Sequence, residues 1–145
     1  MSNHNVAPKK AFGQNFLTDQ HYLNRIASAV RPDKGQTVVE IGAGTGALTK
    51  ALLERGALVV CSEKDERCLP VLEELSNSFP NSLTIVDGDA LEQDFTTLAP
   101  KGSILAGNLP YNIGTQVVLN GLASADYFTR HVYLLQKEVV QRICA

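Results

Sequence analysis

The chain has 145 residues, of which 44% are hydrophobic and 19% are charged, a composition typical of one globular domain with a buried core. Its net charge of −2 excludes a strongly basic chain, although residues 1–35 carry five basic and two acidic residues, an excess of +3. No apolar run is as long as a membrane span, so we expect no membrane segment. The cysteines (Cys61, Cys68, Cys144) and the histidines show neither disulfide nor zinc spacing, so we expect no metal site.

Hydrophobic periodicity predicts alternating helices and strands. Leu23, Ile26, Ala27 and Val30 follow a helical spacing, and the helix should begin after residue 18 or 19 and end before Pro32. Strands are expected at 37–41, 58–62, 83–86, 103–106 and 131–136, helices at 47–55, 66–78, 115–123 and from 137, and a helical turn at 95–98. This alternation predicts a parallel sheet with helices on both faces.

Two residues affect the expected helix ends. Gly56 is well placed to end the helix at 47–55, because glycine adopts the left-handed conformation that closes many helices. Pro70 lies inside the helix expected at 66–78, where it should delay the start of the helix or kink it, since proline has no backbone N–H.

The first strand leads into a glycine-rich loop that is typical of cofactor sites. Gly42, Gly44 and Ala47 match the pattern G-x-G-x-x-G/A, and Glu63 lies 21 residues after Gly42, at the end of the second strand. Such glycines let the backbone approach a ligand, and an acid at that distance can hold both hydroxyls of a ribose. The pattern fits both NAD and S-adenosylmethionine, since both carry adenosine, and a turn without a ligand would also produce it.

Further residues favour a methyl donor over NAD. Gly46 extends the loop to G-x-G-x-G, and the acidic Glu40 lies two residues before its first glycine. Asp89 follows the third strand and could accept a hydrogen bond from the adenine amino group, although Asp-Gly-Asp also suits an ordinary turn.

The run Asn108-Leu109-Pro110-Tyr111 suits the methylation of an exocyclic amine of a nucleobase. The side-chain oxygen of Asn108 and the carbonyl of Leu109 could accept from the two N–H groups and free the nitrogen lone pair. Pro110 keeps that carbonyl out of a helix, and Tyr111 offers a flat face on which a flipped base could stack. The alternative is an ordinary strand-to-helix turn. The run should lie at the carboxyl edge of the sheet, beside the glycine loop.

Six stretches, in order, resemble the small-subunit rRNA adenine N6,N6-dimethyltransferases of the kasugamycin-resistance type. They are FGQNFL at 12–17, VVEIGAGTGALT at 38–49, SEKD at 62–65, GDAL at 88–91, NLPYNIGT at 108–115 and LLQKEVVQR at 134–142. The resemblance implies an α/β, Rossmann-like class I methyltransferase domain with a seven-stranded, mostly parallel sheet, followed by a small helical domain. Residues 1–17 would be an arm and cofactor-flanking loop, and residues 18–145 an S-adenosylmethionine-binding domain truncated at its C-terminus, without the helical domain.

The resemblance also implies an activity and a set of site residues. The family dimethylates N6 of two adjacent adenines near the 3′ end of 16S rRNA, by direct transfer from S-adenosylmethionine, during ribosome biogenesis. The implied cofactor contacts are Gln14, Asn15, Leu17, Gly42, Gly44, Glu63, Lys64, Asp89, Ala90 and Asn108. The implied catalytic residues, which hold the target adenine, are Asn108, Leu109, Pro110 and Tyr111.

The implied partner is the rRNA of an immature small ribosomal subunit, bound by a monomeric protein without metal or membrane. The scattered cysteines fit a reducing cytoplasm. Three alternatives stay open: a large-subunit rRNA methyltransferase of the macrolide-resistance type, a non-catalytic nucleic-acid-binding relative such as a mitochondrial transcription factor, and an NAD-dependent oxidoreductase.

Overall fold

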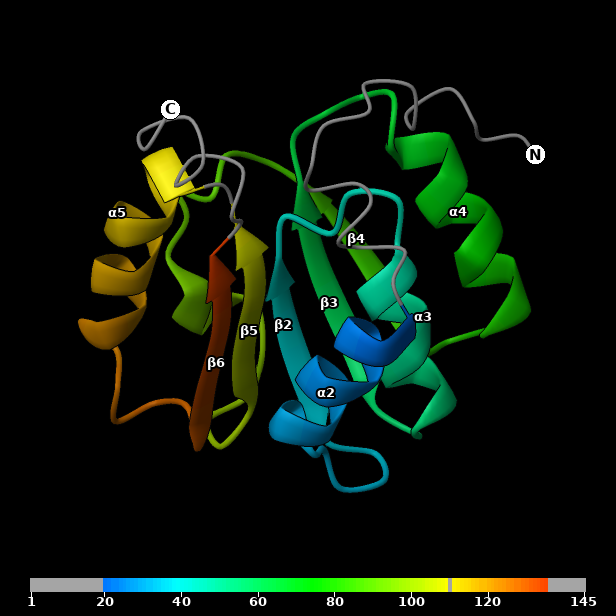
Figure 1. Ribbon diagram of the computed structural model, residues 1–145, viewed down its shortest axis with the longest axis horizontal. Helices are drawn as coiled ribbons and strands as arrows, with labels where there is room; N and C mark the ends of the chain where they lie inside the picture. The colour runs from blue at the N-terminus through cyan, green and yellow to red at the C-terminus, as the bar shows by residue number, and fades with distance from the viewer. Residues whose placement is uncertain (1–19, 110, 136–145) are drawn as a thin grey trace.

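A computed structural model describes residues 20–109 and 111–135, and the side chains of 111–115 and 135 are not part of the description. These residues form a five-stranded sheet in the order β4-β3-β2-β5-β6 (Figure 1). The strands are β2 Thr37–Ile41, β3 Leu58–Glu63, β4 Leu83–Asp87, β5 Ile104–Leu109 and β6 Arg130–Leu135. All four pairings are parallel, as the alternation of strands and helices predicts.

Helices cover both faces of this sheet, and each face has its own core. The helices are α2 Gln20–Val30, α3 Ala47–Glu54, α4 Leu69–Ser78, α5 Tyr111–Leu122 and the short 3-10 helix η2 Phe95–Thr97. Because side chains alternate along a strand, Val38 and Ala106 pack against α2, α3 and α4, whereas Val39 and Leu105 pack against η2 and α5. In Figure 1, α4 and α5 lie at opposite ends of the sheet.

The two residues expected to affect helix ends do so. Gly56 follows α3 with a φ of 89°, and its N–H donates to the carbonyl of Leu53 over 3.0 Å. Helix α4 begins at Leu69 rather than at residue 66, so its expected start was wrong by one turn. Pro70 lies in the first turn of α4, where its missing N–H costs no helical hydrogen bond, and it therefore delays the helix without kinking it.

Two boundaries near the adenine-holding run differ from those expected. Strand β5 continues to Leu109 instead of ending at residue 106, because Gly107, Asn108 and Leu109 pair with Tyr133, Leu134 and Leu135 of β6. Helix α5 begins at Tyr111 rather than at residue 115. Asn108 and Leu109 thus belong to the sheet itself and not to a turn after it.

Candidate active site

The sheet order places the predicted site at a topological switch point. From β2 the chain continues through α3 to β3 on one side, whereas β5 pairs with β2 on the other side. In open α/β sheets, ligands bind where the connections from neighbouring strands diverge in this way, outside the carboxyl ends of the strands. The glycine loop leaves β2 at this point, and Asn108 lies next to it on β5.

The glycine loop is held by the residues that end β3. Gly42 and Gly44 have φ values of 72° and 60°, which favour glycine. The Gly42 N–H donates to the carbonyl of Ser62 over 2.8 Å, and the Gly44 N–H donates to Oε1 of Glu63 over 2.7 Å. The second oxygen of Glu63 accepts from the N–H of Asp65 over 3.0 Å. The acid predicted to hold a ribose therefore also anchors the loop beside which a ribose would lie.

Three polar side chains gather on one face of the sheet at its carboxyl edge. Glu40 pairs in register with Cys61 on β3 and with Ala106 on β5, and both of these belong to the core beneath α2, α3 and α4. Because side chains alternate along a strand, Glu63 and Asn108, each two residues further on, lie on the same face as Glu40. The three strands thus bring two carboxyl groups and an amide to one edge.

Asn108 is the most unusual member of this group. The residue is 5% exposed, yet neither Nδ2 nor Oδ1 of its side chain has a hydrogen-bond partner among the described residues. Burying an amide without a partner costs roughly 1–3 kcal/mol, so native proteins rarely retain one without a function. Its backbone oxygen lies 3.7 Å from the position that a Cβ on Gly42 would occupy, which puts it against the glycine loop. A ligand with one donor and one acceptor in this place would satisfy the amide.

Lys64 and Asp89 form a contact that the sequence did not suggest. Nζ of Lys64 lies 3.6 Å from Oδ2 of Asp89 at the ends of β3 and β4, with both side chains partly exposed. Oδ1 of Asp89 accepts from the N–H of Leu91 over 2.9 Å, which gives the turn that was the alternative interpretation of this motif. The turn does not exclude the predicted role, because Oδ2 still faces outward toward Lys64. Ala90 is half-buried against the core beneath η2 and α5.

Several predicted site residues lie outside the described part of the chain. They are Gln14, Asn15, Leu17, Pro110 and the side chain of Tyr111. Leu109 is described, and the residue is 1% exposed, with its side chain in the core on the η2 and α5 face. The predicted role of Leu109 uses its backbone carbonyl and not this side chain.

Sequence reasoning missed the pairing of Glu40 with Thr49. Glu40 is buried, and the Thr49 hydroxyl of α3 donates to its Oε1 over 2.5 Å, a short hydrogen bond. Burial raises the pKa of Glu40 to about 8, the Thr49 hydrogen bond lowers it, and the nearby Glu63 raises it further. The signal in the sequence was a single acid in the otherwise apolar strand Thr37–Ile41. Its partner could not be found, because nothing in the sequence marks Thr49 as buried.

A second missed contact joins β3 to the segment after β4. The Ser62 hydroxyl donates to Oε1 of Gln93 over 2.5 Å. Gly88 passes so close to Gln93 that an added Cβ would lie 2.6 Å from its Nε2. These contacts position the turn that carries Asp89, so the glycine of the Asp-Gly-Asp motif serves close packing.

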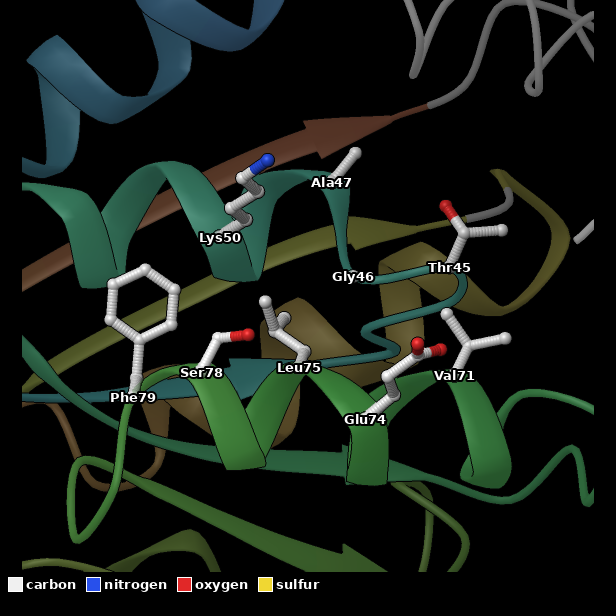
Figure 2. A pocket seen from close by; sticks show the side chains of 9 residues that line it. All are labelled: Thr45, Gly46, Ala47, Lys50, Val71, Glu74, Leu75, Ser78 and Phe79. Carbon is white, nitrogen blue, oxygen red and sulfur yellow. The ribbon is translucent and has the colours of Figure 1, made fainter. Parts of the chain in front are cut away.

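An open pocket of about 360 Å³ lies between α3 and α4, and Figure 2 shows its lining. Lys50 and Ala47 come from α3, and Val71, Glu74 and Leu75 come from α4. It contains none of the predicted contacts with the cofactor or the adenine, so we do not assign it to this site. Within residues 20–109 and 111–135, no group of three or more His, Cys, Asp or Glu could hold a metal ion. No helix in these residues is long and apolar enough to cross a membrane.

Comparison with known proteins identifies the family and the fold. A ribosomal RNA small subunit methyltransferase A from Brucella canis is 44% identical over 98% of the chain and 53% of its own length. A crystal structure of a dimethyladenosine transferase from Plasmodium falciparum superimposes with a TM-score of 0.69 and 28% identity, covering 88% of this chain and 45% of that one. The chain thus spans about half the length of the relatives it matches.

The fold itself recurs in more distant methyltransferases. A phosphoethanolamine N-methyltransferase from Haemonchus contortus, solved with S-adenosylhomocysteine, has a TM-score of 0.61 at 19% identity, over 86% of this chain and 28% of that one. At that identity the likeness concerns the class I methyltransferase fold alone. The family model described as ribosomal RNA adenine dimethylase matches residues 5–145. This chain therefore belongs to the ribosomal RNA adenine dimethylase family.

Proposed function

We propose that this chain binds S-adenosylmethionine and holds the target adenine in an enzyme that dimethylates N6 of two adjacent adenines near the 3′ end of small-subunit rRNA. The observation that carries the proposal is Asn108, whose buried amide has no hydrogen-bond partner among the described residues and lies beside a glycine loop at the switch point of the sheet. Glu63, with its carboxylate already ordered against the loop, supports the binding of an adenosine ribose.

The chemistry follows from hydrogen-bond positions. S-adenosylmethionine supplies an activated sulfonium methyl group. The Oδ1 atom of Asn108 and the carbonyl of Leu109 accept from the two N–H groups of the adenine amine and draw its nitrogen toward tetrahedral geometry. Tyr111 offers a stacking face for the flipped base. The methylated amine can lose its proton to water, so the protein contributes orientation and fixed acceptors rather than a general base.

The names of the curated relatives support the small ribosomal subunit as partner over the large one. We further propose that the protein is monomeric and cytoplasmic and that it acts on an immature small subunit. NAD, the other adenosine ligand, fits this site less well. Glu63 could hold its ribose, but an oxidoreductase would leave the buried amide of Asn108 without a role.

Calorimetry with the 145-residue chain tests the cofactor. S-adenosylmethionine should bind and NAD should not, and the reverse result would overturn the proposal.

Methyl transfer is tested with the chain joined to the part of the Brucella canis relative that lies beyond the match. Labelled methyl groups should enter small subunits that lack dimethyladenine and should not enter large subunits. Equal labelling of both subunits would contradict the proposed partner.

A further inference from the structure

Glu40 is a buried acid to which the proposed chemistry gives no role. It is 1% exposed at the carboxyl end of β2, and the glycine loop begins two residues later. Its recorded hydrogen bond is the one it accepts from Thr49, the third residue of α3. This hydrogen bond joins the two ends of the glycine loop, since β2 comes directly before the loop and α3 directly after it.

The surroundings of Glu40 disfavour a negative charge in the ligand-free protein. The elements packed around it present Cys61 and Glu63 from β3, Ala106 from β5, and the neutral Thr49 from α3. Cys61 is a buried thiol whose pKa is raised to about 12, so it stays neutral and, like any thiol, offers no positive charge to a carboxylate. The charged neighbour among the described residues is thus Glu63, another acid. An acid buried in this way is more stable with its proton than as a carboxylate.

The proposed ligand would change that balance. S-adenosylmethionine carries a sulfonium, an ammonium and a carboxylate, and hence one net positive charge. Glu40 shares the face and the carboxyl edge of the sheet with Glu63 and Asn108, the residues that support its binding. A cation in a poorly solvated site favours the charged form of a nearby acid. We propose that binding of S-adenosylmethionine releases the proton of Glu40 to solvent, so that the resulting carboxylate balances the cationic ligand.

This inference rests on the proposed cofactor and adds a measurable linkage. The O–H bond of the Glu40 carboxyl breaks, the proton passes to the buffer, and the electron pair stays on the carboxylate. S-adenosylhomocysteine has no sulfonium and no net charge, so it should release fewer protons. A methyl donor would then bind more tightly as pH rises, whereas the demethylated product would respond less, which would favour exchange of product for donor at higher pH.

The experiment is calorimetry of the 145-residue chain with S-adenosylmethionine, in buffers of different ionisation enthalpy. At pH 7 we expect on the order of half to one proton released per ligand, and an affinity that rises up to about tenfold between pH 6 and pH 7. S-adenosylhomocysteine should show a smaller release. Glu40→Gln has the shape of the protonated acid and should bind the ligand with no buffer-dependent heat.

A second variant separates titration from structure. Thr49→Val removes a hydrogen bond that lowers the pKa of Glu40, so the rise of affinity should move to higher pH. A merely structural role of the Glu40–Thr49 pair would weaken binding equally at every pH. Binding of S-adenosylmethionine without proton release would overturn this inference alone. Absence of any binding would overturn the proposed cofactor, and this inference with it.

Discussion

At the scale of single residues, the site combines an ordered acid with an unsatisfied amide. Glu63 uses both carboxylate oxygens to hold backbone N–H groups of Gly44 and Asp65. The Asn108 amide has no hydrogen-bond partner in the described part of the chain, although the residue is almost fully buried. The first residue is organised by the fold, and the second is kept at a cost to the fold. A residue retained in spite of its cost to stability is expected at a site of binding or catalysis.

The cost of Asn108 can be measured. In Asn108→Ala, the unpartnered amide is removed and only a small cavity is left, so the ligand-free chain should gain about 1 kcal/mol in free energy of unfolding. Urea denaturation checks this value. When the chain is joined to the remaining part of the Brucella canis relative, the same variant should lose methyl transfer while cofactor binding is largely kept. A variant that unfolds more easily, or that transfers methyl groups at the normal rate, would show that the amide has another partner or another role.

Glu63→Gln tests the anchoring of the glycine loop. The amide oxygen can still accept from Gly44, but the charge that strengthens this bond is lost, and charged hydrogen bonds contribute about 1.5–3 kcal/mol. We expect S-adenosylmethionine to bind roughly 10- to 100-fold more weakly, as measured by calorimetry. Asp65→Asn is a suitable control, because the backbone N–H of Asp65 donates to Glu63 and the substitution keeps that donor. Equal affinity in wild type and Glu63→Gln would remove Glu63 from the site.

At the scale of elements, the approach of α3 to α4 depends on one glycine. Gly46 precedes α3 with a φ of 86°, and an added Cβ would lie 3.1 Å from Leu72 and 3.2 Å from Leu75 (Figure 2 shows Gly46 above Leu75). Gly46→Ala should therefore lower the free energy of unfolding by about 2–4 kcal/mol, through backbone strain and crowding together.

Gly102→Ala is the matched control for this prediction. Gly102 has a φ of 95° but no atom within 4 Å of an added Cβ, so it should lose only the backbone part, about 1–2 kcal/mol. Chemical denaturation of both variants gives the difference. Equal losses in the two variants would mean that α4 moves away from α3 without cost.

The order of the elements and the parallel sheet could be predicted from the sequence, because apolar runs and glycine or proline positions decide them locally. The ends of β5 and α5 could not. Gly107 and Asn108 are poor strand formers, but both pair with β6, and Gly107 also pairs with Ile41 of β2, which keeps them in the sheet. Likewise Gly42, Glu63 and Asn108 could be predicted as site residues from motif and spacing, and this assignment stays a prediction. The Glu40–Thr49 and Ser62–Gln93 contacts could not be predicted, since they depend on which side chains tertiary packing brings together.

At the scale of the whole molecule, the two cores are not equivalent. The core beneath α2, α3 and α4 ends in Glu40, Glu63 and Asn108 at the carboxyl edge, whereas the core beneath η2 and α5 stays apolar up to Leu109. One face of the sheet therefore carries the polar site, and the other supplies rigid packing behind it. Because the polar face includes a buried acid, the stability of the entire domain should depend on pH.

The sign of this dependence follows from the raised pKa of Glu40. Its pKa is about 8 in the folded chain and 4.5 for the ordinary group, so between these values the folded state holds a proton that the unfolded state has lost. The free energy of unfolding contributed by Glu40 therefore falls as pH rises from about 4.5 to 8, by on the order of a few kcal/mol in total.

Comparison with Glu40→Gln isolates this contribution from all other titrating groups. The variant cannot ionise at residue 40, so its advantage in stability over the wild type should be small at pH 5 and largest at pH 8. Urea unfolding of both proteins at several pH values measures the difference. Thr49→Val should extend the fall to higher pH, because it removes the hydrogen bond that lowers the pKa of the acid. Parallel curves for wild type and Glu40→Gln would mean that Glu40 ionises as readily in the folded chain as in the unfolded one, and that the core beneath α3 tolerates its charge.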